Sequence, residues 1–300
     1  MEALHAHVVT TGGNEGAFDP HGEGRGEGMS QLDLDGRTKA EVAVERIRMH
    51  ARKGEVLYFA DSYGKDSGVV RELLKLSGVP WEGHHHCGLP EPPELLTFGH
   101  EWHPETVRDK PQRGIFSLVV TNGLPLRTKR WCCALLKERS GAGRTVVTGV
   151  RWGESSARRN RGMYETCFRD GARHYLNPII DWTENDVWAF HKERDIPFCR
   201  LYREGFSRLG CVLCPNHGAA LSAMEIERWP QLAANWRRAG IHSWERGTEG
   251  MKAWATGDAY VDWWLTRARH SRDESQAALL ESGDSQAEAA TRPSAGKGEG

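Results

Sequence analysis

The chain has 300 residues, of which 38% are hydrophobic, and its formal net charge is −1. That length and apolar content support one main domain with a sizeable core, and the charge argues against a globally basic nucleic-acid-binding protein. We expect a cytoplasmic protein without membrane contact, because neither a run of about 18 apolar residues nor a secretory signal is recognisable. Seven cysteines, an odd number, fit metal ligands or packing in a reducing compartment better than disulfides.

Composition divides the chain into four parts. Residues 1–36 and 271–300 are polar and lack apolar periodicity, so both are predicted to be disordered tails. Between them we expect a main domain over residues 37–217 and a C-terminal helical region over residues 218–270. Trp229 and Trp236 of the helical region are seven residues apart, the spacing of one helix face, which indicates core packing, with stacking on nucleic-acid bases as the alternative.

Strand and helix patterns alternate along the main domain. An amphipathic helix comes first, with Val42, Val44, Ile47 and Met49 expected on its apolar face. The segments that follow are, in order, the strand EVLYFA, the helix GVVRELLKLSG, an extended segment around WEGHHHCG, helices around PPELLTFGHEW and CCALLKERS, the strand RTVVTGV and a helix begun by DWTENDVWAF. This order predicts an α/β fold, a parallel twisted sheet with helices on both faces, in which ligands bind at the carboxyl ends of the strands.

The loop DSYGKDS follows the first predicted strand. Gly64 permits a tight turn, and the amides that enter the next helix point toward whatever lies above them. Lys65 adds a positive charge, and Ser62 and Ser67 add hydroxyl donors, so the loop predicts a cradle for a phosphate group. Its spacing differs from that of the Walker A loop. The alternative is a capped turn in which Asp66 or Ser67 is the helix N-cap.

The middle of the chain is locally basic. Residues 127–173 contain twelve lysines and arginines against four acids, which indicates an anionic ligand. In the segment TGVRWGESSARR, Gly149 lies at the end of a predicted strand, and we therefore expect Arg151, Glu154 and Arg158 beside that ligand. Ordinary solvated surface is the alternative for the arginines.

Four of the cysteines form two pairs. Cys132 and Cys133 are adjacent at a predicted helix start, and Cys211 and Cys214 form a CxxC sequence that follows a glycine. Four converging thiolates suit a [4Fe–4S] cluster or Zn²⁺. Adjacent cysteines favour a cluster with separate iron corners over one small tetrahedral ion, and buried thiols without a metal are the third interpretation.

The polar loop resembles the S-G-G-K-D-S loop of the PP-loop ATP pyrophosphatase superfamily, with Tyr63 in place of the first glycine. The segments RWCCALLKE, TGVRWGESSARR, NPIIDWTENDVWAF and RLGCVLCP are similar, in this order, to the phosphoadenosine phosphosulfate (PAPS) reductase family over about residues 40–217. The segment HHHCGLPEPPELLTF also resembles the reductase-like sulfur-transfer proteins of phages and DNA phosphorothioation systems.

This resemblance implies a PP-loop, HUP-like nucleotide-binding fold and a bound ATP, adenylyl sulfate or PAPS. It implies a [4Fe–4S] cluster on the four paired cysteines, since the adenosine phosphosulfate reductases that carry one use the same arrangement. The residues expected to hold the nucleotide are Ser62, Tyr63, Gly64, Lys65, Asp66, Ser67, Gly149 and Glu154.

The leading functional hypothesis is ATP-dependent adenylation of an acceptor, followed by displacement of AMP by sulfur. The residues expected to be catalytic are Lys65, Asp66, Arg151 and Arg158, of which the three cations would stabilise charge on the phosphate oxygens. Mg²⁺ is expected to bridge those oxygens, with Asp61 or Asp66 orienting it. The assimilatory reductases have a nucleophilic cysteine near the C-terminus, and no cysteine follows Cys214 here, so we expect the usual sulfite-forming route to be absent.

Two alternatives stay open. One is a phosphoadenylyl-sulfate or adenylyl-sulfate reductase that uses an external thiol, and the other is a non-catalytic module that binds a nucleotide or a nucleic acid. The expected sulfur or thiol donor is a cysteine desulfurase or a thioredoxin-like protein. The acceptor is open between a nucleic acid and a metabolite, and a homo-oligomer is allowed.

Overall fold

The computed structural model describes residues 36–138, 140–167, 173–247 and 253–266, and the expected tails lie outside this part apart from residue 36. Its centre is a six-stranded sheet with the strand order β3-β2-β1-β4-β6-β5. All neighbouring strands are parallel except β5, which pairs antiparallel with β6 at one edge. The strands are β1 (Leu57–Ala60), β2 (Trp81–His86), β3 (Val107–Asp109), β4 (Thr145–Val147), β5 (Tyr164–Cys167) and β6 (Arg173–Leu176).

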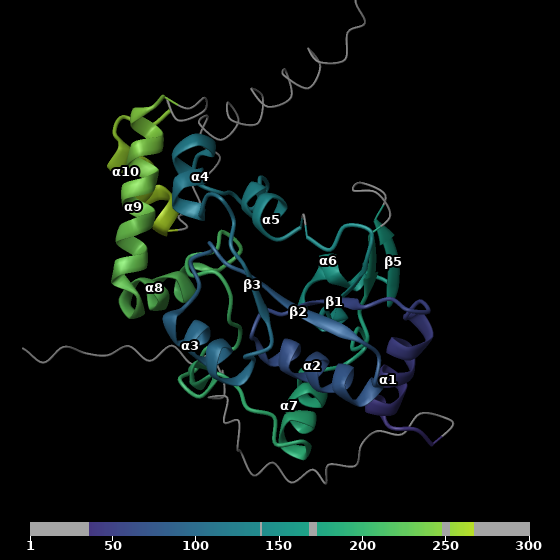
Figure 1. The fold of residues 1–300 in the computed structure, drawn as a ribbon. Helices are drawn as coiled ribbons and strands as arrows, with labels where there is room; N and C mark the ends of the chain where they lie inside the picture. Colours follow the sequence, from purple (N-terminus) through teal and green to yellow (C-terminus); the bar gives the residue numbers. More distant parts are fainter. Residues whose placement is uncertain (1–35, 139, 168–172, 248–252, 267–300) are drawn as a thin grey trace, which may run out of the picture.

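Helices connect the strands and continue beyond the sheet (Figure 1). The α-helices are α1 (Lys39–His50), α2 (Lys65–Ser77), α3 (Pro93–Trp102), α4 (Ile115–Asn122), α5 (Trp131–Leu136), α6 (Ser156–Arg159), α7 (Glu184–Glu193), α8 (Ala219–Arg228), α9 (Pro230–Glu245) and α10 (Gly257–Thr266), with 3-10 turns η1 (Trp152–Glu154) and η3 (Arg200–Tyr202). The predicted α/β fold with a mostly parallel sheet is confirmed. Strands β3, β5 and β6 are additions that the sequence pattern did not predict.

Helices α1, α2 and α7 cover one face of the sheet (Figure 1). Alternate residues of the strands, among them Leu57, Phe59 and Val147, join the apolar sides of these helices in one buried core. The predicted apolar face of α1 was wrong at Met49, which is 71% exposed, while Ala43, adjacent to Val44, is fully buried. The helix therefore turns a narrower stripe toward the sheet than the spacing of its apolar residues suggests.

The opposite face of the sheet is polar. Tyr58, His84 and His86 point there, and both the Tyr58 hydroxyl and His84 Nδ1 lie 3.1 Å from the carboxylate of Asp109. In Figure 1 α5 lies on this side of the sheet, and the loop after it approaches closely, since a Cβ on Gly141 would meet the Tyr58 ring at 3.2 Å. Helical structure thus lies on both faces, but only one face has an apolar core.

The C-terminal helices α8, α9 and α10 pack with α4 on one side of the sheet domain (Figure 1). Their core contains Trp229, Trp236 and Trp264, each at most 7% exposed, together with residues of α3, α4 and α5. The expected core packing of these tryptophans is confirmed. The division of the chain at residue 217 stays a prediction, because the helical region shares its core with helices of the main domain.

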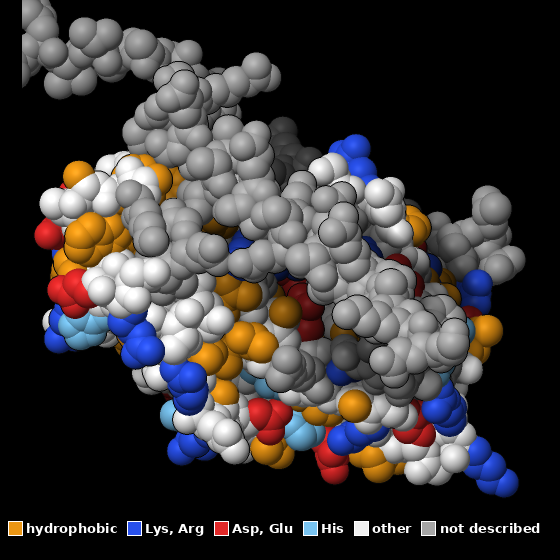
Figure 2. All heavy atoms as spheres, turned by 90° about the horizontal axis from the view of Figure 1, so that it is seen from above, with side chains coloured by type: hydrophobic (Ala, Val, Ile, Leu, Met, Phe, Trp, Pro, Cys, Tyr) orange, Lys and Arg blue, Asp and Glu red, His pale blue; other side chains and the backbone are white. Residues whose placement is uncertain are grey.

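No helix in the described part of the chain is long and apolar enough to cross a membrane. Seen from above (Figure 2), lysine and arginine side chains are spread among hydrophobic and acidic ones on that face of the molecule. This mixed surface agrees with the near-zero net charge.

Helix α3 packs against the loop between β1 and α2 through Gly99. A Cβ at this position would lie 2.2 Å from the Tyr63 ring, which is 1% exposed. Such a distance is far inside van der Waals contact, so only glycine fits.

We expect Gly99→Ala to lower the free energy of unfolding by about 1–3 kcal/mol, because the added methyl group displaces the Tyr63 ring. Urea denaturation measures this change. The matched control is Gly210→Ala, where a Cβ meets nothing within 4 Å, and its effect should stay within about 0.5 kcal/mol. Equal effects of the two substitutions would contradict the packing argument.

Candidate functional site

The predicted phosphate loop lies at the carboxyl end of β1, as expected. Gly64 is the N-cap of α2, and no side chain caps that helix. The interpretation of Asp66 or Ser67 as the N-cap was therefore wrong. Ser67 Oγ instead accepts a hydrogen bond from the Ser62 amide and lies 2.8 Å from Ser62 Oγ, so the two serines close the loop on itself.

Tyr63 occupies the left-handed region of backbone conformation, with φ of 58°. A non-glycine residue there costs about 1–3 kcal/mol, which explains why glycine suits this position. Burial of the ring offsets the strain: it stacks on His85 at 4.0 Å between ring centroids and meets His103 edge-on. The Tyr63 side chain thus packs on the buried side of the loop, so the ring is not available to a ligand.

Asp61 also supports the loop. Its carboxylate accepts hydrogen bonds from the Tyr63 amide at 2.9 Å and the Thr106 hydroxyl at 3.0 Å, and lies 2.6 Å from His103 Nδ1. The residue is 3% exposed. The expectation that Asp61 orients a metal ion was wrong, because its oxygens already serve these buried partners.

A network of four charged side chains joins α2, α7 and the segment after β4. Arg151, 3% exposed, donates from Nε to Asp66 at 2.6 Å and from a terminal nitrogen to Glu184 at 2.6 Å. Lys65 Nζ lies 3.2 Å from both of the same carboxylates. Burial disfavours the charge on Arg151, but Asp66 and Glu184 more than offset it and raise its pKa. Arg151 therefore positions the loop rather than reaching out to a ligand.

Gly149 lets the end of β4 approach this network. A Cβ there would lie 3.1 Å from the Asp66 side chain and backbone. The structure thus places Gly149 next to the loop as predicted, and its role is close approach.

A group of arginines lies on the outer side of the network. Arg158 forms an ion pair with Glu154, and the Arg151 amide donates to Glu154 at 3.1 Å. Burial, followed by repulsion from Arg208 and other guanidinium groups, lowers the pKa of Arg158 to about 10. The groups whose charge acts on Arg158 are Arg208, Asp66, Arg130 and Arg161. Converging positive charges of this kind are typical of an anion-binding site.

The four paired cysteines lie in one neighbourhood. The charges of Cys211, Cys133 and Cys214 all act on Lys137, and together with Glu91 they raise its pKa although burial opposes this. A hydrogen bond from Cys132, supported by Arg130 and Lys137, lowers the pKa of Cys133, and Arg130 donates to Cys133 Sγ at 3.4 Å. No three His, Cys, Asp or Glu side chains in the described part are arranged to hold one metal ion.

The C-terminal helices hold the CxxC loop in place. Leu213, between the two cysteines, has φ of 59°, and its amide donates to the buried carboxylate of Glu225 in α8 at 2.8 Å. His217 Nδ1 lies 3.0 Å from the same carboxylate oxygen, and Trp236 donates to the Val212 carbonyl at 3.2 Å. The helical region therefore shapes the second cysteine pair.

A buried chain of polar groups runs from the phosphate loop to the cysteines. His85 Nδ1 lies 3.0 Å from the Asp61 carbonyl, and His85 Nε2 lies 2.8 Å from Glu91. The other oxygen of Glu91 is 4.0 Å from Lys137 Nζ, and the carbonyl of Pro90 accepts from the Val212 amide at 2.7 Å. The two predicted sites are thus neighbours connected through the turn that contains Glu91.

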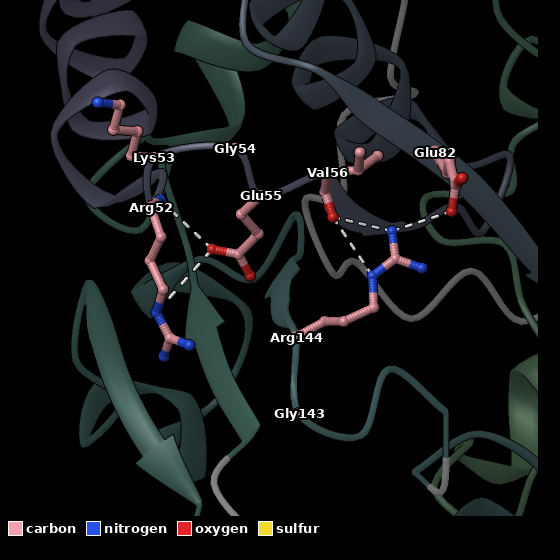
Figure 3. A pocket seen from close by; sticks show the side chains of 8 residues that line it. All are labelled: Arg52, Lys53, Gly54, Glu55, Val56, Glu82, Gly143 and Arg144. Carbon is pink, nitrogen blue, oxygen red and sulfur yellow. Dashed lines mark hydrogen bonds and ion pairs between the residues drawn. The ribbon is translucent and has the colours of Figure 1, made fainter.

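A hollow of about 480 Å³ lies elsewhere, at the amino ends of the strands (Figure 3). In its lining, Arg144 donates to the Val56 carbonyl and to Glu82, and Glu55 accepts from the Thr145 amide. In α/β sheets ligands bind at the carboxyl ends. We therefore assign the functional site to the phosphate loop and not to this hollow.

Several site residues were not predicted from the sequence. Glu184 lies in the segment DWTENDVWAF, for which the sequence predicted only a helix start, and it pairs with Lys65. Tyr202, whose hydroxyl accepts from the Lys65 amide at 3.0 Å, carries no local signal. Glu91 and Glu225 are acids among many, and only their burial marks them.

Comparison with known proteins agrees with this site. The family model described as the phosphoadenosine phosphosulfate reductase domain matches residues 57–217, which include the loop and all four paired cysteines. The chain belongs to the PAPS reductase family. The expectation of an enzyme is supported, since named relatives are reductases.

Two curated relatives of this PAPS reductase family member are adenosine 5'-phosphosulfate reductases. The protein of Neisseria meningitidis serogroup A is 33% identical over 122 residues, which are 39% of this chain and 50% of that protein. The protein of Allochromatium vinosum is 25% identical over 224 residues, 68% of this chain and 86% of that protein. A 37.8 kDa protein of Escherichia phage 186 is 35% identical over 99 residues, 33% of this chain and 28% of that protein. The chain thus spans about half the length of the Neisseria reductase.

Solved structures show weaker similarity. The PAPS reductase of Candida auris, in a phosphate complex, superposes with a TM-score of 0.44 and 17% identity over 60% of this chain and 96% of that one. The FMN adenylyltransferase of Candida glabrata reaches 0.40 with 18% identity, over 59% of this chain and 65% of that one. At this level neither similarity supports a functional argument.

We expect Cys133, in protein freed of metal by a chelator and kept reduced, to react with iodoacetamide at a lower pH than an ordinary thiol, whose pKa is about 8.5. Arg130→Met removes the cation that favours the thiolate and should move the reaction profile to higher pH by about one unit. Peptide mass spectrometry measures the extent of the reaction at each pH. The range of about pH 4–10 covers both strongly lowered and ordinary thiol pKa values. Lys129→Met, a change at an exposed neighbour, is the control, and an identical profile for Arg130→Met and wild type would contradict the assignment.

Proposed function

We propose that the protein binds ATP at the phosphate loop, adenylates an acceptor and exchanges the adenylated oxygen for sulfur. The observation that carries this proposal is that arginine side chains lie between the phosphate loop and the paired cysteines. Arg158 lies within electrostatic reach of Asp66 in the loop and of Arg130, and Arg130 bonds Cys133. A polyphosphate on the loop is thereby brought next to a set of thiols.

The loop supplies the ligands for the phosphates. The Lys65 amide is bonded to the Tyr202 hydroxyl, so the amides that follow it at the start of α2 would bind the phosphates. The Lys65 ammonium, 5% exposed and paired with Asp66 and Glu184, would turn to the phosphates when ATP binds, and Arg158 would add a second positive charge. Glu184 is the more exposed carboxylate of the network, with 45% of its side chain exposed, and with Asp66 it would hold the Mg²⁺ that accompanies ATP. The proposal thus replaces Asp61 by Glu184 as the partner of Mg²⁺.

The first step forms one bond and breaks one. An acceptor oxygen attacks the α-phosphorus of ATP, and the bond between the α-phosphorus and its bridging oxygen to the β-phosphorus breaks, so that pyrophosphate leaves. Negative charge grows on the phosphate oxygens during this exchange, and the cations of Lys65 and Arg158 stabilise it. Arg151 contributes by holding Asp66 and Glu184 in place.

The second step needs a sulfur nucleophile from a partner protein. A persulfide from a cysteine desulfurase attacks the acceptor carbon, the bond to the AMP oxygen breaks, and a second thiol cleaves the resulting disulfide to leave the acceptor with its sulfur. All seven cysteines of the chain are free thiols, which supports a reducing, cytoplasmic setting for this chemistry. A thioredoxin-like protein is a suitable source of the second thiol.

We further propose that Cys132, Cys133, Cys211 and Cys214 hold a [4Fe–4S] cluster. Four cysteine thiolates are the ligand set of such clusters, and the cations Arg130 and Lys137 beside them offset the negative charge that thiolates bring. When bound, the cluster supplies an iron–sulfur centre for electron or sulfur chemistry. The four side chains would supply its ligands, and Glu225 holds the CxxC loop through the Leu213 amide.

A second candidate is a reductase of adenylyl sulfate or PAPS that takes electrons from an external thiol. The observation that favours it is that the Neisseria and Allochromatium relatives are adenosine 5'-phosphosulfate reductases. The same loop and arginines would hold the nucleotide. Release of sulfite from adenylyl sulfate in the presence of thioredoxin, without pyrophosphate exchange from ATP, would select this candidate.

We expect wild-type protein to exchange labelled pyrophosphate into ATP in the presence of its acceptor. Lys65→Met should lower that rate by about 100-fold or more, because a cation on the transferring phosphate is lost. Lys75→Met, in the last turn of the same helix, is the matched control and should leave the rate within about twofold of wild type. Equal rates for Lys65→Met and wild type would refute the assignment of Lys65.

We expect anaerobically purified protein to contain about four irons and four acid-labile sulfides per chain, with broad visible absorption. The double substitution Cys211→Ala, Cys214→Ala should abolish both, while Cys199→Ala, at a buried cysteine outside the two pairs, should retain them. Iron, sulfide and zinc analyses with a visible spectrum measure this. One zinc per chain and no colour would refute the cluster and favour a nucleotide-binding module with a structural metal.

A further inference from the structure

Trp152 is an exposed tryptophan at the rim of the phosphate site. It directly follows the buried Arg151 and is 42% exposed, whereas Trp229, Trp236 and Trp264 are at most 7% exposed. Two hydrogen bonds anchor it, from the indole nitrogen to the Arg161 carbonyl at 2.7 Å and from its amide to the Ile180 carbonyl at 2.8 Å. An anchored indole that leaves its ring partly in water loses little entropy when another flat group stacks on it.

The surroundings of this indole are cationic. Arg161, whose carbonyl holds the ring, belongs to the set of guanidinium groups that act on Arg158, together with Arg208 and Arg130. Arg159 and Arg208 are exposed. Arg158 forms an ion pair with Glu154 and Arg161 with Glu165, so the cations of this set outnumber the acids that pair with them.

We propose that this rim binds a single-stranded nucleic acid, with one base stacked on Trp152 and the neighbouring phosphates on Arg208 and Arg130. Charged groups that follow a sugar-phosphate backbone and aromatic rings that stack bases are the two parts of sites for single strands. A duplex hides the faces of its bases in the stack, so an indole on the protein surface cannot reach them without extruding a nucleotide.

The rim lies close to the predicted phosphate loop. Arg158 lies within electrostatic reach both of Asp66 in the phosphate loop and of Arg130 and Arg208 on the rim. A strand held on the rim therefore has a nucleotide next to the site where ATP would react. Resting on the proposed adenylation, we assign the acceptor class as a base oxygen or other oxygen of a single-stranded nucleic acid.

The test is fluorescence anisotropy with a labelled single strand of mixed sequence, about 15 nucleotides long, as DNA and as RNA in separate arms. The matching duplex is measured beside them. This length lies near the upper end of the roughly 4–16 nucleotides that single-strand sites cover. Trp152→Ala should weaken single-strand binding by about tenfold, since stacking of one base accounts for a change of about 5- to 150-fold. Trp102→Ala, which removes a tryptophan that is 46% exposed at the end of α3, should change binding by less than about twofold.

Two further variants separate stacking from folding and charge. Trp152→Phe keeps a ring and loses the indole bond to Arg161, and it should keep most of the affinity if stacking is the cause. Arg208→Ala should lower affinity and reduce the slope of log affinity against log salt by about 0.7 for a single strand. Whichever of DNA or RNA binds more tightly identifies the source of the strand.

Equal losses from Trp152→Ala and Trp102→Ala, or equal binding of duplex and single strand with no effect of Trp152→Ala, would overturn the proposal. So would wild-type protein that binds no strand at low micromolar concentration. The pyrophosphate exchange assay separates this failure from that of the proposed function. Specific strand binding without pyrophosphate exchange would support the nucleic-acid site and refute the proposed adenylation. Exchange with a small acceptor and no strand binding would support adenylation and refute the nucleic-acid site.

Discussion

The site depends on one buried guanidinium. Arg151 reaches from the segment after β4 to Asp66 at the start of α2 and to Glu184 at the start of α7, and so it ties three separate elements into one surface. A buried charge of this kind is stable only while its partners are present, since loss of one partner of a buried pair costs about 3–5 kcal/mol. The position of Lys65 follows from it, because Lys65 shares both of those carboxylates.

The thiols depend on a different set of contacts. The adjacent pair lies on α5, and the CxxC pair is held by a carboxylate from α8, so the two pairs meet only because the C-terminal helices pack against the sheet domain. The turn around Glu91 connects this arrangement to the phosphate loop through His85 on one side and Lys137 on the other. Because every member of this chain is largely buried, a shift at one site has a direct physical route to the other.

Electrostatics distinguish the functional edge from the rest of the surface. The molecule as a whole is nearly neutral and its visible charges are mixed (Figure 2), but near the loop burial, followed by repulsion from neighbouring arginines, lowers the pKa of Arg158. Guanidinium groups stay together in this way when an anion is their usual neighbour. The carboxyl edge of the sheet therefore combines the predicted phosphate loop, thiols and an exposed indole, each of which has a role in the proposals.

The sequence by itself determined the α/β fold, the phosphate loop and the two cysteine pairs, because strand and helix periods, loop chemistry and cysteine spacing depend on residues a few positions apart. It misplaced Met49, Asp61 and the N-cap of α2, since which face is buried and which oxygen is occupied depend on distant neighbours. Only the tertiary structure decided that Arg151 turns inward to an aspartate 85 positions away. It also decided that Glu184 joins the site and that Trp152 stays exposed while Trp229, Trp236 and Trp264 are buried. These outcomes follow from the path of the folded chain, which brings together charges and rings that no local pattern relates.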